Sequence, residues 1–160
     1  MSTKAFLPSP LGALLIEDDG QCLTSIRILA IGEAPPADCG APLSGSPAAE
    51  AARQLAAYFA GTLEEFDLPL LPLATPRGEA LRSAIVAIPA GKTLSYGQLA
   101  RIAGSAPRAI GQACARNVFP IIVPCHRVIG SGGTIGHYSG GSGIITKRWL
   151  LNHERQGGLL

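Results

Sequence analysis

The sequence has no run of the roughly 20 apolar residues that a membrane-spanning helix needs. Residues 1–20 also lack the charged start and long apolar stretch of a secretory signal. Four cysteines are present, but none forms a CxxC pair, and their spacing fits neither a zinc ribbon nor a disulfide framework. We therefore expect reduced thiols, no bound metal, no membrane partner and a cytoplasmic location, or a nuclear one if the source is eukaryotic.

Acidic residues are scarce in the second half of the chain. Residues 76–160 contain ten basic residues but only Glu79 and Glu154 as acids, a net charge of +8. Residues 1–75 contain three basic and nine acidic residues, a net charge of −6. A small segment at +8 attracts polyanions, because Lys and Arg release the counterions that phosphates condense. Charge alone gives equal weight to a solvated basic face that binds nothing in particular.

The first half predicts a small α+β domain. The segments Leu11–Glu17 and Cys22–Ala30 flank the turn Asp18-Asp19-Gly20, which is typical of a β-hairpin. Ser46-Pro47 is a good helix start, and Gly61 stops the helix. The proline-rich stretch Phe66–Pro76 predicts a strand followed by a linker.

We place a domain boundary near Thr75, which gives domains at residues 1–75 and 76–160. Beyond it, Leu81 and Ile85 lie on one face of an amphipathic helix that ends at Pro89. Ser95-Tyr96-Gly97-Gln98 fits a capping box that opens a short helix, and a second helix follows over about residues 106–116. Two short helices joined by a turn containing glycine form a helix-turn-helix pattern, although many helical hairpins with this pattern bind no nucleic acid.

The third part of the second domain centres on Pro124-Cys125-His126-Arg127. The apolar run Val118–Val123 predicts a buried lead-in to it. Seven of the fourteen residues at 130–143 are glycines, which predicts a flexible loop able to approach a flat ligand closely. A last helix over Ile144–Glu154 is expected to pack through Ile145, Trp149 and either Leu150 or Leu151.

Cys125 is the candidate nucleophile, because a neighbouring imidazole or guanidinium can stabilise a thiolate. His126 is placed to accept the thiol proton, directly or through water, if a third group fixes its tautomer. Glu154 is the preferred group, since it is one of only two acids in this half. Three alternatives remain open: a buried inert thiol, a metal site that also uses His137 and Cys114, and a cysteine hydrolase with His137 or His153 as its base.

Three blocks of sequence resemble the O6-alkylguanine-DNA alkyltransferases, also called methylated-DNA–protein-cysteine methyltransferases. They are Ile88-Pro-Ala-Gly-Lys-Thr-Leu-Ser-Tyr-Gly-Gln-Leu-Ala100, Arg108-Ala-Ile-Gly-Gln-Ala113 leading to Asn117, and Ile122-Val-Pro-Cys-His-Arg-Val-Ile129 followed by Gly136-His-Tyr-Ser-Gly-Gly141 and Lys147–Glu154. The likeness covers residues 66–154 in the family's order. It implies an α+β fold, with a small N-terminal domain of antiparallel sheet and helix and a mainly helical, winged-helix-like C-terminal domain.

The resemblance implies a role for each matching residue. Cys125 would accept the alkyl group, His126 would relay its proton, Glu154 would orient His126, and Asn117 would brace the turn before the active-site segment. The residues implied in DNA binding are Tyr96, Arg108, Ala109 and Gly111, with Arg108 as the finger that enters the duplex. Those implied around the flipped guanine are Tyr96, Val128, Tyr138 and Ser139. The family needs no cofactor for the transfer.

The partner that the resemblance implies is double-stranded DNA, bound by a monomer through the minor groove with the alkylguanine flipped out of the stack. The expected activity is a single irreversible transfer from O6-alkylguanine to Cys125, with O4-alkylthymine as a second candidate substrate. An alkyltransferase-like sensor, which binds the lesion without repairing it, is the alternative. The sequence departs from the family pattern at Arg77-Gly78, at Val118 where proline is usual, and in a longer glycine loop.

Overall fold

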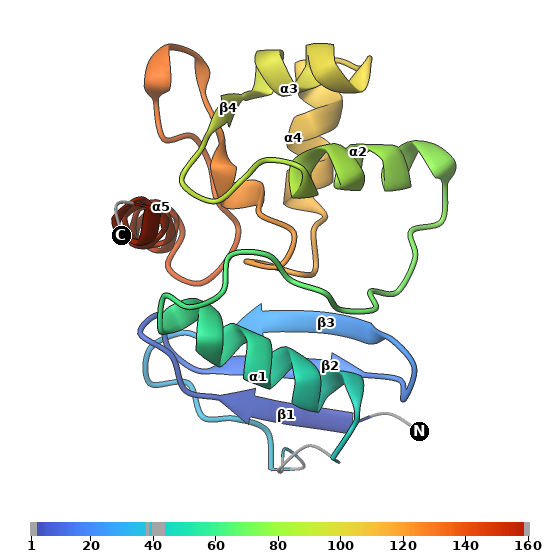
Figure 1. Cartoon of the computed structure of the whole chain (residues 1–160), viewed down its shortest axis with the longest axis vertical. Helices are drawn as coiled ribbons and strands as arrows, with labels where there is room; N and C mark the ends of the chain where they lie inside the picture. The colour runs from blue at the N-terminus through green and yellow to red at the C-terminus, as the bar shows by residue number, and fades with distance from the viewer. Residues whose placement is uncertain (1–2, 38, 40–43, 159–160) are drawn as a thin grey trace. The chain divides into compact units, whose positions relative to one another are not determined.

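In the computed structural model, which describes residues 3–37, 39 and 44–158, contacts divide the chain into two units, Met1–Leu71 and Pro72–Leu160. The first unit combines a three-stranded antiparallel sheet with one long helix, and the second is mainly helical (Figure 1). This arrangement confirms the predicted α+β class. That residues 1–75 and 76–160 behave as independent domains stays a prediction.

The sheet of the first unit is built around the predicted hairpin. Strands β2 (Leu14–Asp18) and β3 (Leu23–Ile28) pair antiparallel, and β1 (Thr3–Leu7) pairs with the other edge of β2. Oδ1 of Asp19 accepts hydrogen bonds from the backbone N–H groups of Gln21 and Cys22 at 2.9 and 2.8 Å. Gly20 adopts φ +91°, a left-handed conformation that favours glycine, so the sequence of the turn fixes the register of the hairpin.

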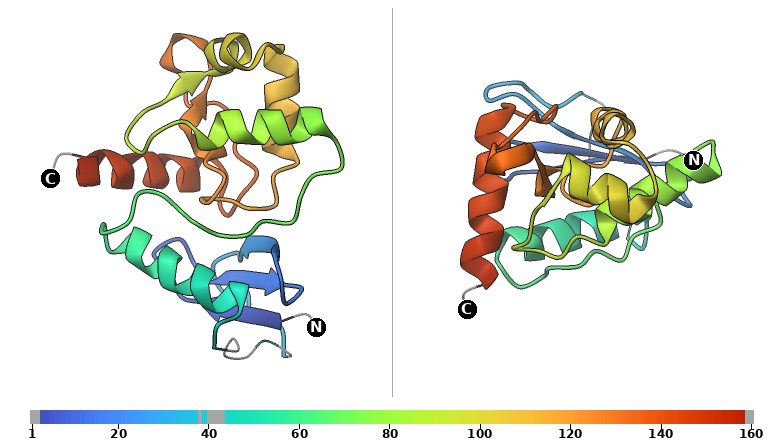
Figure 2. Two further views of the ribbon diagram at one scale, coloured as in Figure 1. Left: turned by 45° about the vertical axis from the view of Figure 1, so that its right-hand side comes forward. Right: turned by 90° about the horizontal axis from the view of Figure 1, so that it is seen from above.

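Helix α1 (Pro47–Phe59) covers one face of this sheet (Figures 1 and 2). Leu55 and Tyr58 are almost fully buried, and each contributes about 1.5–3 kcal/mol of apolar burial. The buried carboxylate of Asp18, at the end of β2, accepts a hydrogen bond from Ala48 N at 2.8 Å. Ser46 accepts from Ala49 N at 3.1 Å, so the first turn of the helix is capped twice.

The first unit differs from expectation in two places. Strand β1 was not predicted, and Phe66–Pro76, where a strand was predicted, forms only a single bridge between Leu70 and Leu23. Prolines at positions 69 and 72 remove two backbone donors, which leaves too few N–H groups to extend a ladder.

The second unit begins with α2 (Pro76–Val86), capped by Thr75, followed by the short strand β4 (Leu94–Ser95) and α3 (Tyr96–Ala103). The predicted capping box is confirmed. Gln98 N donates to Ser95 Oγ at 3.1 Å, and Gln98 Oε1 accepts from Ser95 N at 2.8 Å. Gly104 ends α3 in a left-handed conformation with φ +63°, which turns the chain into α4.

Helix α4 (Pro107–Ala115) packs against both α3 and α2, which confirms the helix-turn-helix pair (Figure 1). After it come the short 3₁₀ turn η1 (Cys125–Arg127), strand β5 (Val128–Ile129), the turn η2 (Ser131–Gly133) and helix α5 (Ile144–Gly158). Strand β5 pairs parallel with β4, with Leu94 opposite Val128. The active-site segment is thereby joined to the start of the helix-turn-helix.

Helix α5 packs through Leu150, as predicted, but not through Ile145. Ile145 is 72% exposed, whereas Thr146, Lys147 and Leu150 are buried. The inner face of the helix therefore carries the polar Thr146 and the charged Lys147, where Ile145 was expected. The burial of Lys147 has a specific cause, described below.

Candidate active site

The thiol of Cys125 lies at the start of η1, at the end of a buried lead-in. Phe119, Ile121 and Val123 are almost fully inaccessible, as predicted, while Val118 is 46% exposed. Cys125 N donates to Val123 O at 2.7 Å, which closes the turn just before the thiol. The side chain of Cys125 retains only 6% exposure, so the sulfur is held on a rigid and nearly dry support.

The side chain of Asn117 spans this turn with three contacts. Its Nδ2 donates to Val123 O at 3.1 Å and lies 3.4 Å from Cys125 Sγ, and its Oδ1 accepts from Phe119 N at 3.0 Å. The turn contains Ile121 at φ +75°, a backbone region that β-branched residues rarely adopt. The bonds of Asn117 hold the chain in this strained conformation directly beneath the thiol.

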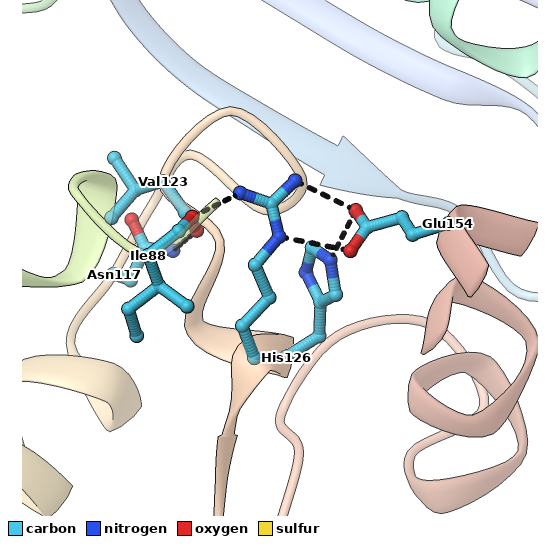
Figure 3. Close-up of polar contacts among 6 residues, drawn as sticks. Ile88, Asn117, Val123, His126 and Glu154 are labelled. Atoms are coloured by element: carbon cyan, nitrogen blue, oxygen red, sulfur yellow. Dashed lines mark hydrogen bonds and ion pairs between the residues drawn. The ribbon is translucent and has the colours of Figure 1, made fainter. Parts of the chain in front are cut away.

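His126 and Arg127 both contact the carboxylate of Glu154 (Figure 3). His126 Nε2 lies 2.7 Å from Glu154 Oε2, and Arg127 Nε and Nη2 donate to the two carboxylate oxygens at 2.8 and 2.9 Å. Arg127 Nη1 also donates to Ile88 O at 2.6 Å. All three charged or polar side chains are buried, so the cluster joins α5 to the active-site segment and to the chain that follows α2.

This geometry fixes the tautomer of His126. A carboxylate at 2.7 Å requires the proton on Nε2, which leaves Nδ1 with a free lone pair. Nδ1 is buried and has no hydrogen-bond partner within the described part of the chain. Burial lowers the pKa of His126 despite the nearby carboxylate, so the ring is neutral near pH 7 and can accept a proton.

The electrostatics around Cys125 act in both directions. Burial raises the pKa of its thiol, while the Asn117 amide and the Lys147 ammonium oppose that rise. Although burial alone would raise the pKa of Glu154, hydrogen bonds from His126 and Arg127 hold it well below its usual range. The cluster therefore keeps a permanent carboxylate beside a neutral base, next to a thiol whose proton is not lost spontaneously.

Lys147 explains the unexpected inner face of α5. Its Nζ donates to Val128 O at 2.7 Å, just before the glycine-rich loop at residues 130–143, and to His137 O at 3.0 Å, within that loop. Burial lowers the pKa of Lys147. The side chain thus connects the middle of this loop to the active-site strand.

A small pocket of about 50 Å³ opens onto the sulfur. Its lining residues are Tyr96, Gly111, Cys114, Ala115, Cys125, His137, Tyr138 and Ser139. The hydroxyl of Tyr138 is buried without a hydrogen-bond partner in the described residues, which leaves it available to a bound molecule. Gly140 allows this tyrosine to lie there, because a Cβ at that position would approach its ring to 2.9 Å.

The structure brings most of the predicted site residues together. Cys125, His126, Glu154 and Asn117 form the cluster described above, and Tyr96, Gly111, Tyr138 and Ser139 line the pocket. The remaining three lie elsewhere. Arg108 is exposed on α4, Ala109 lines a different cavity, and Val128 supplies the carbonyl that Lys147 binds.

The roles of three residues of the site were not predicted. Arg127 was considered only as a neighbour that lowers a thiol pKa, yet it is committed to Glu154 and Ile88. Lys147 was given no role, and Cys114 was placed only in a metal site. The i, i+3 spacing of Gly111 and Cys114 on one helix was a usable signal, because it puts both on the same face.

The described residues contain no cluster of three or more side chains suited to a metal ion. Nor does any helix in residues 3–37, 39 and 44–158 have the length and apolarity to cross a membrane.

Comparison with known proteins agrees with this geometry. Residues 78–156 match the DNA-binding domain of the 6-O-methylguanine DNA methyltransferase family, and residues 3–72 match its ribonuclease-like domain. A Mycobacterium tuberculosis protein named methylated-DNA–protein-cysteine methyltransferase is 41% identical over 151 residues, covering 93% of this chain and 90% of the relative. The human protein of that name is 37% identical over 169 residues, covering 94% of this chain and 79% of the relative.

Solved structures give the same result. The crystal structure of Mycobacterium tuberculosis OGT in complex with DNA superposes with a TM-score of 0.81 at 39% identity, over 97% of this chain and 94% of that one. A second crystal structure, of the Mycobacterium tuberculosis O6-methylguanine methyltransferase, superposes with a TM-score of 0.79 at 38% identity, over 98% and 94% of the two chains. This chain belongs to the 6-O-methylguanine DNA methyltransferase family.

Proposed function

We propose that this protein repairs O6-alkylguanine in DNA directly, by transferring the alkyl group to Sγ of Cys125. The observation that carries the proposal is the position of the thiol. Cys125 lines the tyrosine-walled pocket, receives a contact from Asn117 and precedes His126, whose tautomer Glu154 fixes. The relatives named methylated-DNA–protein-cysteine methyltransferase support the same reaction class.

In the transfer, the thiol proton moves to the free Nδ1 of His126, directly or through a water molecule. The sulfur electron pair then attacks the alkyl carbon, a new C–S bond forms, and the C–O6 bond breaks with its electron pair on the guanine. A proton donated to the base completes the restoration of guanine. Tyr96 and Tyr138 line the pocket and carry the hydroxyl groups best suited to polarise or protonate the base.

The resulting thioether is stable, so each molecule acts once. Because Cys125 is almost buried, the damaged base has to leave the helical stack to reach it. In our proposal, the side chain of Arg108, which is exposed on α4, fills the space that the base leaves in the duplex. Entry of α4 into the minor groove suits a protein that inspects any guanine, since that groove discriminates sequence poorly. We expect one monomer to act on each lesion.

The stoichiometry of repair tests this proposal. We expect a duplex with one O6-methylguanine, supplied in excess, to lose one lesion per protein molecule and then no more. Cys125→Ser should still bind the duplex but remove nothing. Continued turnover would indicate a hydrolase, and tight lesion binding by the wild-type protein without any repair would indicate a sensor; either result would refute the proposed transfer.

The role of Arg108 is tested separately. Arg108→Ala should slow repair of the duplex at least tenfold while leaving alkylation of Cys125 by free O6-benzylguanine unchanged. Equal losses with both substrates would contradict a role in base extrusion.

A further inference from the structure

A second cavity of about 380 Å³ lies between α2 and α4. Its walls combine apolar side chains with the three guanidinium groups of Arg77, Arg82 and Arg116. No acidic residue lines it. Asn117 and Val123 belong to the thiol site as well, but the transfer proposed above uses no other residue of this cavity.

The three arginines differ in how they are held. Arg82 is a structural part of the wall: its side chain is 11% exposed, its guanidinium lies 5.3 Å from the centre of the Phe119 ring, and it approaches Glu79 at 3.7 Å. Arg77 and Arg116 are exposed. Arg77 Nη2 donates to Ser105 Oγ at 3.0 Å, which holds it near the turn before α4, whereas Arg116 caps the other end of that helix.

The two cavities lie on opposite sides of α4. Ala109, Gln112, Ala113 and Arg116 line the arginine cavity at i, i+3, i+4 and i+7. Gly111, Cys114 and Ala115 line the thiol pocket. The second row starts two residues after the first, a rotation of about 200° around a helix with 3.6 residues per turn. Helix α4 therefore lies between most of the arginine cavity and the thiol pocket, whereas Asn117 and Val123, which also line the arginine cavity, contact Cys125.

A helix in a groove of duplex DNA has one sugar-phosphate strand along each of its flanks. The damaged strand must run along the flank that opens to Cys125, because its base enters there. The complementary strand then runs along the flank that carries Arg77 and Arg116. These two residues lie near opposite ends of α4, a separation of about 15 Å or some four base-pair steps.

We infer that Arg77 and Arg116, at the mouth of the cavity between α2 and α4, bind the phosphates of the undamaged complementary strand. This inference rests on the proposed function. Charge identifies the ligand, because guanidinium groups bind phosphates well. The residues that line the cavity include no carboxylate that would compete for Arg77 and Arg116. The contacts add affinity without reading sequence.

The double variant Arg77→Ala/Arg116→Ala tests the inference with two forms of one lesion oligonucleotide. On the duplex, we expect binding at least tenfold weaker at physiological salt, with the slope of log K against log salt reduced by about 1 for each arginine removed. On the single-stranded form, binding and repair should stay within twofold of wild type, since no complementary strand is present.

Three controls keep the test sharp. Alkylation of Cys125 by free O6-benzylguanine should be unchanged, which establishes that the variant is folded and reactive. Arg155→Ala removes an exposed charge from α5 and should leave the salt slope on duplex unaltered. Arg77→Lys/Arg116→Lys keeps both charges and should recover most of the duplex affinity.

An unchanged salt slope on duplex DNA, or equal losses on single and double strands, would overturn the inference and leave the cavity to some other anion. Neither result would affect the proposed function, because transfer to Cys125 is measured independently with the free base.

Discussion

The Nε2 atom of His126 lies 2.7 Å from Oε2 of Glu154, and the guanidinium of Arg127 donates to both oxygens of the same carboxylate. Glu154 thus fixes the tautomer of the proposed base and neutralises a buried arginine at once. Its role is both chemical and structural, and the two can be separated by experiment.

Glu154→Gln should lower both stability and rate. Glutamine keeps the size of the side chain but leaves Arg127 buried without a counter-charge, at a cost of about 3–5 kcal/mol in the free energy of unfolding. Chemical denaturation measures this loss. Glu33→Gln, which removes an exposed ion pair to Arg27, is the control and should cost less than about 1 kcal/mol. Similar losses in both variants would contradict a central role for the buried cluster.

The rate of alkyl transfer should rise with pH. Below the ordinary imidazole pKa of 6.5, protonation of His126 removes the acceptor, and since burial lowers the pKa of this histidine, the fall begins only below that value. At the alkaline end, burial raises the pKa of Cys125 from 9.0, so the rate should still increase at pH 9 as thiolate forms. Stopped-flow kinetics with free O6-benzylguanine measure this rate without DNA, so the pH dependence of DNA binding does not affect the result. A rate that is constant between pH 5 and 9 would exclude a titrating base and thiol.

Asn117→Asp and Asn117→Ala should change the pKa of Cys125 by different amounts. Both lose the donors to Val123 O and the thiol, but aspartate keeps an acceptor for Phe119 N and adds a negative charge near Sγ. We expect the pKa of Cys125, followed by thiolate absorbance or alkylation rate, to rise further in Asn117→Asp than in Asn117→Ala. A Cys125 pKa in Asn117→Ala equal to that of the wild type would mean that the amide does not influence the thiol.

Lys147→Met should loosen the loop at residues 130–143. The substitution keeps an unbranched side chain but removes the terminal amine, which leaves the carbonyls of Val128 and His137 without their donor, a loss of about 1–3 kcal/mol. Hydrogen exchange should become faster in the loop and at β5. Arg148→Met, at the exposed neighbouring position, should change neither, and equal effects of the two substitutions would refute the anchoring role.

Local signals in the sequence were sufficient for the parts of the fold that local chemistry decides. Asp18-Asp19-Gly20 identified the hairpin, and the Ser95–Gln98 pair identified the start of α3, because each relies on hydrogen bonds within four residues. Strand β1 carries no such signal and forms only by pairing with β2. Ile145 was misplaced because apolarity predicts burial on average, and the buried face of α5 is decided instead by carbonyls that Lys147 reaches.

For the site as well, the sequence indicated some contacts and not others. The scarcity of acids in residues 76–160 correctly singled out Glu154 as the partner of His126, although 28 positions separate them. Arg127 also binds Glu154, and its second partner is Ile88 O, 39 positions away in the sequence. No local sequence pattern indicates contacts between residues so far apart. Cys114 joined the thiol pocket through helix geometry, not through any recognisable motif.

Peptide mass spectrometry after reaction with a duplex containing one O6-methylguanine tests the central claim most directly, because two cysteines, Cys114 and Cys125, line the same pocket. We predict a gain of one methyl group per protein, confined to Cys125, with Cys114→Ser fully active and Cys125→Ser unmodified. A methyl group on Cys114, or no gain in mass despite lesion binding, would contradict the account.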